Sequence, residues 1–226
     1  MVALGIDTST PAGSIGLAEG DSLQGEIHLA AGGHHQERLL RGIDALLDLL
    51  GIPIGSVSVI AVALGPGSFT GLRVGIATAK GLALALGVPA YGLSTLAAMA
   101  LHFRRRGLPI APVIDAGRRE VYAALFRVED GLIRTIREEK AWTPEEFFSL
   151  LPPEPVLLCG DGARRYSDRI PVDQEVERVL ETEGCFLGGT LARWGAEQVG
   201  GKSPWSLRQL KPNYLRPADA EVGRTR

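Results

Sequence analysis

The residues of this sequence best suited to chemistry are two aspartates at the ends of predicted strands. Asp7 ends the apolar run VALGID, and Asp115 ends the similar run IAPVID. In a protein that uses ATP, such carboxylates would organise the metal ion. Their surroundings differ, because residues 8–10 are Thr-Ser-Thr whereas residues 116–119 are Ala-Gly-Arg-Arg. We expect the arginine pair to neutralise Asp115 rather than leave it free for magnesium.

A glycine-rich stretch in the second half is a further candidate for nucleotide binding. The sequence CGDGA at 159–163 directly follows an apolar run, so it could bind the adenosine part of a nucleotide or could equally be a turn. The weak candidates for a cofactor site are therefore Asp7, Thr8, Asp115, Gly160 and Gly162.

Other catalytic and metal-binding patterns are not legible in the sequence. The histidines stand at positions 28, 34, 35 and 102, and no two have the i, i+4 spacing that places two imidazoles on one helix face. We interpret His34 and His35 as residues at the start of a helix. Cys159 and Cys185 lack CxxC spacing and are expected to be free thiols. The sequence therefore predicts no catalytic residue and no metal site, and a peptidase is a remote alternative.

A glycine loop precedes a long apolar segment in ALGPGSFTGLRVGIATAKGLALAL, residues 63–86. The loop matches neither the P-loop G-x-x-x-x-G-K-[ST] nor the dinucleotide fingerprint G-x-G-x-x-G, so its spacing does not demand a phosphate. The predicted helix at 69–86 is apolar nearly all round, and its interior glycines would let another backbone approach closely. Either the rest of the chain or another subunit must cover it.

These residues belong to an order of elements that occurs twice. The first copy has predicted strands at 2–7, 13–19 and 23–29, an amphipathic helix at 35–50, a strand at 59–65 and the helix at 69–86. The second copy has strands at 110–116, 120–128 and 132–138, a helix from 143 and a strand at 155–160. This α/β pattern is a duplicated βββαβα unit, the organisation of actin-like and sugar-kinase-like ATPases. We expect an N-terminal lobe at 1–105 and a C-terminal lobe at 106–226.

Composition excludes several classes of protein. The chain has 226 residues, of which 45% are hydrophobic and 22% charged, and its net charge is −2. No apolar run reaches the length of a membrane helix, so we expect a cytoplasmic protein without a membrane partner. The net charge argues against binding nucleic acid by the overall field, although Arg104–Arg106 and the basic segment 202–226 could touch phosphates.

Four stretches together resemble one protein family over nearly the whole chain. They are GIDTST, HHQERLL, GPGSFTGLRVGIATAKGLA and PNYLRPADAE, and they resemble the TsaB family, also called YeaZ. The resemblance implies an actin-like, RNase H-like (ASKHA) two-lobed fold and a role in making N6-threonylcarbamoyladenosine (t6A37) in tRNA. It also implies a non-catalytic subunit that dimerises with a catalytic paralogue, TsaD, through helices 35–50 and 69–86. An ATPase, TsaE, joins the assembly; ATP and metal are expected on the partner subunits, and tRNA is contacted only indirectly or weakly.

The expected partner interface lies on these two helices. It consists of Leu39, Ile43, Leu46, Gly71, Leu72, Gly75, Ile76 and Ala79. In the absence of the partner we expect a homodimer through the same surface, because large bare apolar patches on monomers are rare. Gly75→Arg is expected to abolish association while the monomer stays folded. The alternative is an ATP-dependent phospho- or carbamoyl-transferase that uses Asp7 and Asp115.

Overall fold

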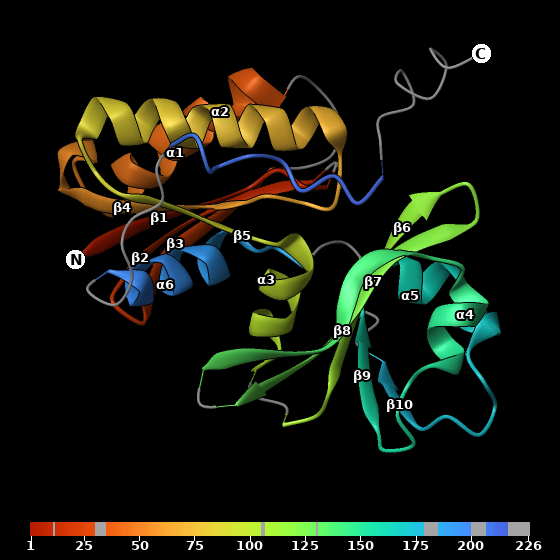
Figure 1. The fold of residues 1–226 in the computed structure, drawn as a ribbon. Helices are drawn as coiled ribbons and strands as arrows, with labels where there is room; N and C mark the ends of the chain where they lie inside the picture. The colour runs from red at the N-terminus through yellow and green to blue at the C-terminus, as the bar shows by residue number, and fades with distance from the viewer. Residues whose placement is uncertain are drawn as a thin grey trace, which may run out of the picture. The chain divides into compact units, whose positions relative to one another are not determined.

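The protein forms two compact units, described here from a computed structural model. The structure describes residues 1–10, 12–29, 35–104, 107–129, 131–178, 185–199 and 207–216. One unit contains Met1–Ala98 and Phe186–Asn213, and the other contains Met99–Cys185 and Tyr214–Arg226 (Figure 1).

The N-terminal unit is built on a mixed five-stranded sheet with the order β3-β2-β1-β4-β5. Its strands are β1 (Val2–Asp7), β2 (Gly13–Glu19), β3 (Ser22–Leu29), β4 (Val57–Ala63) and β5 (Ala90–Leu93). The first three form an antiparallel meander, whereas β4 runs parallel to both β1 and β5. A short 3₁₀ helix, η1 (Ile54–Ser56), precedes β4, and α3 (Thr95–His102) follows β5.

Alternation along the central strands separates the two faces of this sheet. Large aliphatic residues such as Leu4, Ile6 and Ile60 point to one face, where they pack with α1 (His35–Leu50) and α2 (Phe69–Leu86). Small residues on the other face admit α6 (Gly188–Gln198), which packs on β1, β2 and β4. Figure 1 shows α1 and α2 on one side of this sheet and α6 on the other.

The second unit repeats this strand order. Its sheet, β10-β9-β6-β7-β8, again joins an antiparallel meander to a parallel strand, because β6 pairs antiparallel with β7 and parallel with β9. The strands are β6 (Ile110–Gly117), β7 (Glu120–Glu129), β8 (Leu132–Trp142), β9 (Val156–Cys159) and β10 (Val176–Arg178). Its short helices are α4 (Pro144–Ser149), α5 (Asp161–Arg165) and the 3₁₀ helix η3 (Ser167–Arg169). The duplicated βββαβα organisation expected from the sequence is confirmed.

The predicted C-terminal lobe, 106–226, differs from the observed second unit at its C-terminal end. Residues 186–213, including α6, belong to the N-terminal unit. The reason is that glycines of both α6 and the sheet allow close packing. A Cβ on Gly5 of β1 would lie 2.0 Å from the Gly188 carbonyl oxygen, and one on Gly195 of α6 would lie 2.8 Å from the Ala61 side chain. Only glycines at these positions let the helix approach the sheet so closely.

Candidate functional site

Asp7 lies at the end of β1 with its side chain buried. Asp7 is 1% exposed, and the amide of Ser9 donates a hydrogen bond to its Oδ1 at 2.9 Å. The other carboxylate oxygen, Oδ2, has no hydrogen-bond partner within the described part of the chain. Burial raises the pKa of Asp7 to about 6; hydrogen bonding with Ser9 opposes this shift, and the charge of Glu26 adds to it.

The glycine loop and α2 pack directly against the turn that follows Asp7. Thr8 Oγ1 donates to the Gly71 carbonyl oxygen at 2.7 Å, and the Ser68 amide donates to the Ser9 carbonyl oxygen at 2.6 Å. A Cβ on Gly71 would lie 2.1 Å from the Thr8 carbonyl oxygen, and one on Gly75 would lie 2.2 Å from Thr8 Oγ1. The close backbone approach expected from these two glycines therefore occurs within this chain.

Further buried polar atoms lie in the N-terminal unit. Ser9 Oγ and Thr95 Oγ1, like Asp7 Oδ2, have no partner among the described residues, and both residues are 1% exposed. A buried polar atom without a partner costs free energy unless a bound group satisfies it. Asp7 and Ser9 therefore offer oxygen atoms of the kind that bind a cation or a protonated group.

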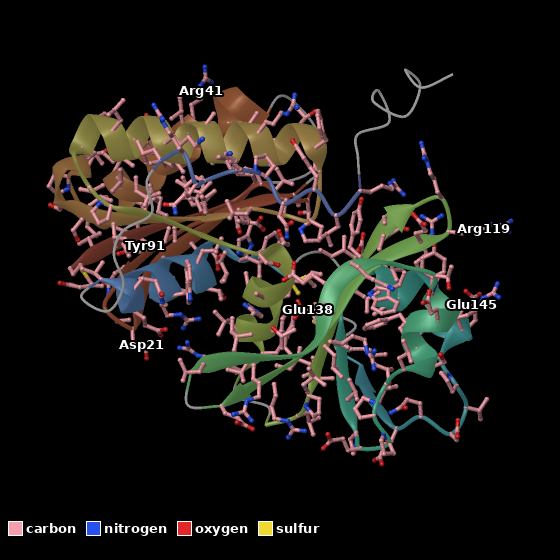
Figure 2. The ribbon with its side chains drawn as sticks, in the orientation of Figure 1. Asp21, Arg41, Tyr91, Arg119, Glu138 and Glu145 are labelled. Atoms are coloured by element: carbon pink, nitrogen blue, oxygen red, sulfur yellow. The ribbon has the colours of Figure 1, made fainter. Side chains whose placement is uncertain are left out.

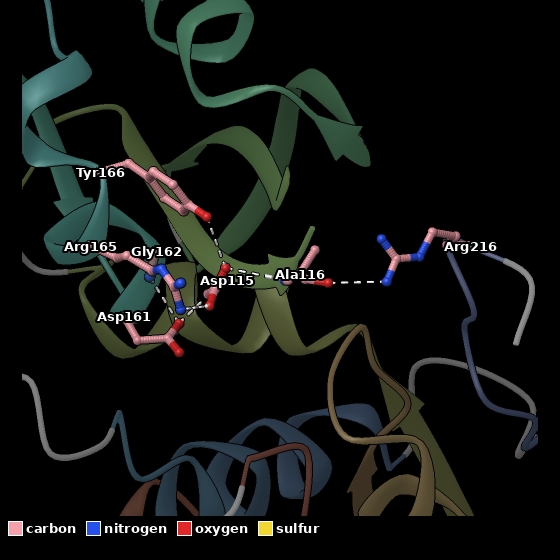
Figure 3. A network of polar contacts seen from close by, with 8 residues as sticks. Asp115, Ala116, Asp161, Gly162, Arg165, Tyr166 and Arg216 are labelled. Atoms are coloured by element: carbon pink, nitrogen blue, oxygen red, sulfur yellow. Dashed lines mark hydrogen bonds and ion pairs between the residues drawn. The ribbon is translucent and has the colours of Figure 1, made fainter. Parts of the chain in front are cut away.

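Asp115 lies two residues before the end of β6 in the second unit and has a different environment. The amide of Gly117 donates to its Oδ1 at 3.1 Å, which is the same contact that Ser9 makes with Asp7. In addition, Arg165 of α5 donates to Oδ2 at 2.7 Å and the Tyr166 hydroxyl donates to Oδ1 at 3.3 Å, as Figure 3 shows. This carboxylate is therefore neutralised by an ion pair.

The neutralising arginine was not identified from the sequence. Arg118 and Arg119 are the central residues of the turn between β6 and β7, where Gly117 pairs with Glu120. The ion pair comes from Arg165, which is 50 residues away in the sequence. Neutralisation of Asp115 was thus predicted, but its source was not. Burial and the Asp115 charge raise the pKa of Tyr166.

Gly160 and Gly162 position α5 against β6. A Cβ on Gly160 would lie 2.3 Å from the Val113 carbonyl oxygen, and one on Gly162 would lie 2.9 Å from the Ile114 carbonyl carbon. Between them, Asp161 Oδ1 accepts hydrogen bonds from the amides of Asp115 and Gly162. CGDGA therefore forms the turn that leads from β9 into α5.

The residues expected at the partner interface are all buried inside the N-terminal unit. They are Leu39, Ile43, Leu46, Gly71, Leu72, Gly75, Ile76 and Ala79. This choice of residues was wrong, because the helical periodicity did not reveal which face meets the sheet. Gly75→Arg would also force a side chain onto Thr8, so it would disturb folding rather than test association.

The opposite faces of the same two helices are exposed. Only 33% of the residues of α2 are buried, and its outward positions are Phe69, Thr70, Arg73, Ala77, Gly81, Leu84 and Ala85. Leu84 is 75% exposed, and Leu49 at the end of α1 is 79% exposed. We call this exposed side of α1 and α2 the outer helix face. By length and composition alone α2 could cross a membrane. Because a helix that packs on a sheet passes the same test, this is weak evidence for a membrane span.

The contacts that hold the start of α6 were missed in the sequence. Ser14 Oγ accepts a hydrogen bond from the Gly188 amide at 2.8 Å, and Glu26 Oε1 accepts one from the Gly189 amide at 2.8 Å. The available signal was the spacing of small residues in GGTLARWGA, which gives a helix a face without large side chains.

Some residues named in the sequence analysis lie outside the described part of the chain, and others are described but lie away from the two aspartates. His34, Arg105, Arg106 and, within the basic segment 202–226, residues 202–206 and 217–226 lie outside the described residues. Cys159 and Cys185 are free thiols, the first buried and the second half-buried, and burial together with Cys185 raises the pKa of Cys159. Among the described residues, no group of three or more His, Cys, Asp or Glu is arranged to hold a metal ion.

The sequence comparisons identify the family. The model of the family described as TsaD, tRNA N6-adenosine threonylcarbamoyltransferase, matches residues 24–169. A Bacillus subtilis protein described as tRNA threonylcarbamoyladenosine biosynthesis protein TsaB is 31% identical over 98% of this chain and 97% of its own length. A Haemophilus influenzae protein with the same description is 32% identical over 96% of this chain and 94% of its own length.

Solved structures agree with the sequence comparisons. YeaZ from Pseudomonas aeruginosa is 29% identical, covers 94% of this chain and 99% of that chain, and has a TM-score of 0.81. Ethanolamine utilization protein EutJ from Carboxydothermus hydrogenoformans covers 87% of this chain and 89% of that chain; its TM-score is 0.52 at 11% identity, so it shares the fold alone. The two sheets, each with an aspartate at or near the end of its first strand, have the actin-like arrangement, and the chain belongs to the TsaB (YeaZ) family.

Proposed function

We propose that this chain is a non-catalytic subunit required for making N6-threonylcarbamoyladenosine in tRNA. The proposal rests on relatives of almost the same length that are described as tRNA threonylcarbamoyladenosine biosynthesis proteins. In this role the chain binds a TsaD-like catalytic paralogue and works with a TsaE-like ATPase. ATP and metal then act on the partner subunits, and the contribution of this chain is to hold its partner in a competent conformation.

The observation that supports this role is the outer helix face. One face of α2 packs on the sheet, while its outward positions combine small residues, Ala77 and Gly81, with the exposed Leu84. Small residues in a helix surface let a second helix approach closely, and a neighbouring leucine supplies apolar area. On α1, which contacts α2, Leu40 and Leu49 are also exposed. A helical partner is therefore the expected occupant, and a second copy would substitute when the chain is alone.

The experiment that tests this role is a pair of leucine substitutions. Leu84 and Leu132 are 75% and 74% exposed, but they lie in different units, so one probes the outer helix face and the other is a matched control. Leu84→Glu would bury an unpaired charge in the interface and is expected to weaken binding to the TsaD-like partner by at least ~100-fold. Leu132→Glu is expected to change it less than about threefold.

Binding is measured by titration calorimetry, with light scattering to follow the homodimer. Both variants should unfold at the temperature of the parent chain, because neither leucine is buried. Equal affinities for the two variants would exclude the outer helix face as the binding surface. Loss of t6A in cells that carry Leu84→Glu, and not in cells that carry Leu132→Glu, would link the contact to tRNA modification.

The environment of Asp115 supports a non-catalytic role. A carboxylate that organises a metal must be free to bind it, whereas Asp115 Oδ2 is 2.7 Å from the Arg165 guanidinium. A metal ion would have to displace this arginine. The residues of the second unit therefore do not fit a metal-nucleotide site in the observed arrangement.

A second candidate function, an ATP-dependent phospho- or carbamoyl-transferase, is favoured by one observation. Asp7 Oδ2 and Ser9 Oγ are buried without a partner among the described residues, so these two residues could help to hold a bound metal. Calorimetry with Mg-ATP on the isolated chain distinguishes the two functions. Micromolar binding that is lost in Asp7→Ala would favour the transferase, and its absence would leave the scaffold role.

A further inference from the structure

The two cysteines of the chain lie together in the second unit. Cys159 is the last residue of β9, and Cys185 lies in the segment between β10 and α6. The side chains of these two residues share a hydrogen bond. Figure 2 draws the side chains of this unit, with sulfur atoms in yellow. The fold therefore brings into contact the only two thiols of the sequence, which the sequence itself keeps far apart.

The alternation of side chains along β9 places Cys159 on the face of the sheet away from the aromatic cluster. Val156 and Leu158 pack in the cluster that contains Trp142 and Phe147, so Cys159 points to the opposite face. It is fully buried there. A buried free cysteine by itself is only a small apolar side chain. The contact with a second cysteine is the feature that such a packing role does not explain.

The two thiols differ in their access to solvent. Cys185 is half-buried, so a dissolved reagent can reach its sulfur, whereas Cys159 is not exposed at all. Burial and then the neighbouring Cys185 raise the pKa of Cys159, so this thiol holds its proton more firmly than an exposed cysteine does. An accessible cysteine beside a second cysteine is the arrangement in which one thiol meets an oxidant and the other resolves the product. In this pair, Cys185 has the first role and Cys159 the second.

Cys185 stands at the point where the chain leaves the second unit. The next residue, Phe186, is the first of the segment that belongs to the N-terminal unit. Its ring stacks on His28 with the ring centroids 3.5 Å apart, and the Gly188 amide donates to Ser14 Oγ at 2.8 Å. The residues after Cys185 are therefore anchored to the N-terminal unit by contacts of their own. A covalent bond from Cys185 to β9 would fix the other side of this crossing.

We propose that Cys159 and Cys185 are a redox modification site, at which a small disulfide of the glutathione class converts the two free thiols into one intramolecular disulfide bond. Bonded sulfur atoms are about 2.05 Å apart, closer than hydrogen-bonded ones. Cys185 belongs to no helix or strand, so its backbone can move to close this gap without breaking a ladder of hydrogen bonds. The inference does not depend on the proposed function.

The reaction needs no reagent other than the small disulfide. The Cys185 thiol loses its proton to water, and its sulfur attacks one sulfur of the reagent. A mixed disulfide forms, and the other half of the reagent leaves as a thiolate that takes up a proton. Cys159 then gives up its proton and attacks the Cys185 sulfur, which releases the second half of the reagent as a thiol. Two cysteine thiols are thus oxidised while one disulfide is reduced to two thiols.

The test treats the full, native chain with oxidised glutathione and then determines its free thiols and its mass. We expect the chain to lose both thiols and the mass of two hydrogen atoms, to carry no glutathione, and to run as a single chain on a non-reducing gel. Dithiothreitol should restore both thiols. The bond closes residues 159–185 into a loop, so the thermal midpoint of the oxidised chain should exceed that of the reduced chain by roughly 5 to 10 °C.

Two single substitutions separate the roles of the thiols. Cys159→Ala keeps a small apolar side chain in the buried position and leaves Cys185, which should take up one glutathione as a stable mixed disulfide. Cys185→Ser leaves only the buried Cys159, which should react at least about tenfold more slowly than Cys185 does in the first variant. Neither variant should gain thermal stability from the oxidant. The comparison of the oxidised and reduced parent chain does not depend on how either variant folds.

Several results would overturn the inference. The parent chain would then keep both thiols free in oxidised glutathione alone, or would carry one or two glutathiones as stable mixed disulfides. Covalent dimers, or an intramolecular bond that forms only after the chain is unfolded in urea, would equally exclude a native thiol pair. A thermal midpoint that falls on oxidation would show that the bond distorts the native structure, which also contradicts a site built for it.

Discussion

The two aspartate turns of the molecule share one backbone hydrogen bond and have different electrostatics. At or near the end of the first strand of each unit, the aspartate Oδ1 accepts a hydrogen bond from the amide two residues later, at 2.9 Å for Asp7 and 3.1 Å for Asp115. Yet Asp7 is buried with one oxygen unpartnered among the described residues, whereas Asp115 is paired with Arg165. The duplicated topology therefore preserves this hydrogen bond without preserving the charge of its environment.

Glycines hold both turns in place, and the two units differ in how tightly. In the N-terminal unit, a Cβ on Gly71 would lie 2.1 Å from the Thr8 carbonyl oxygen. In the second unit, a Cβ on Gly162 would lie 2.9 Å from the Ile114 carbonyl carbon. Both are backbone atoms, which cannot rotate away as a side chain can, and the distance is shorter at Gly71, so the N-terminal turn has less freedom to adjust.

The largest expected effect is therefore that of a methyl group at Gly71. Gly71→Ala should lower the free energy of unfolding by roughly 3 kcal/mol or more, because the Thr8 carbonyl must move to admit it. Gly162→Ala should cost less, on the order of 1 to 2 kcal/mol. Urea denaturation of the two variants measures the difference.

Gly81→Ala is the control on the same helix. Apart from the adjoining backbone of α2 itself, no atom of the described residues lies within 4 Å of its Cβ position, so the substitution should stabilise the chain by up to about 1 kcal/mol through helix propensity. If Gly81→Ala lowered the free energy of unfolding as much as Gly71→Ala does, the close contact with Thr8 would not be the cause of the Gly71→Ala destabilisation.

The next largest effect is the removal of the buried charge at Asp7. Its pKa is raised to about 6 from 3.8, so the folded state binds more protons between these values. The sign follows from proton linkage: stability from this group is highest below pH 4, falls as the pH rises towards 6, and stays low above it. The penalty at pH 7.5 is up to about 3 kcal/mol.

Asp7→Asn should recover part of this penalty. The amide keeps an oxygen to accept from Ser9, but its Nδ2 is also buried, so the expected gain at pH 7.5 is about 1 to 2 kcal/mol. The advantage of Asp7→Asn over the parent chain should shrink as the pH is lowered to 4. Denaturation at both pH values tests this, and an advantage independent of pH would contradict a buried ionised carboxylate.

Most of the fold follows from local sequence patterns. Apolar runs predicted both first strands, the helical period of 35–50 predicted α1, and the long apolar segment 69–86 after a glycine loop predicted α2, because each pattern reports the burial of its own segment. The two-lobed division was less accurate. Residues 186–213 join the N-terminal unit because Gly5 and Gly16 accommodate Gly188 and Gly189, a match between segments more than 170 residues apart.

The candidate site was likewise predictable only where local sequence patterns report it. The two aspartates and the close packing of Gly71 and Gly75 could be identified, since strand ends and helix glycines are local features. The sequence could not reveal that α2 turns Leu72 and Ile76 to the sheet and Ala77 and Leu84 outward, because a helix apolar on all sides has no preferred inner face. It also could not pair Arg165 with Asp115.

The smallest change in stability should come from breaking the Asp115–Arg165 pair, and it should be opposite in sign to that of Asp7→Asn. Asp115→Asn keeps the oxygen that accepts from Gly117 but loses the ion pair, so it should lower stability by about 0.5 to 1 kcal/mol at pH 7. The value is small because the Arg165 side chain is 64% exposed and solvent screens the attraction. The same asparagine substitution thus stabilises one turn and destabilises the other.

A double-mutant cycle with Arg165→Ala isolates the pair. The coupling free energy between Asp115→Asn and Arg165→Ala should be about 0.5 kcal/mol or slightly more and should decrease in 1 M salt. The cycle of Asp7→Asn with Arg165→Ala should show none, because the two side chains belong to different hydrogen-bond networks. If Asp115→Asn instead stabilises the chain as Asp7→Asn does, then Arg165 does not compensate the charge of Asp115, and the two turns are electrostatically alike.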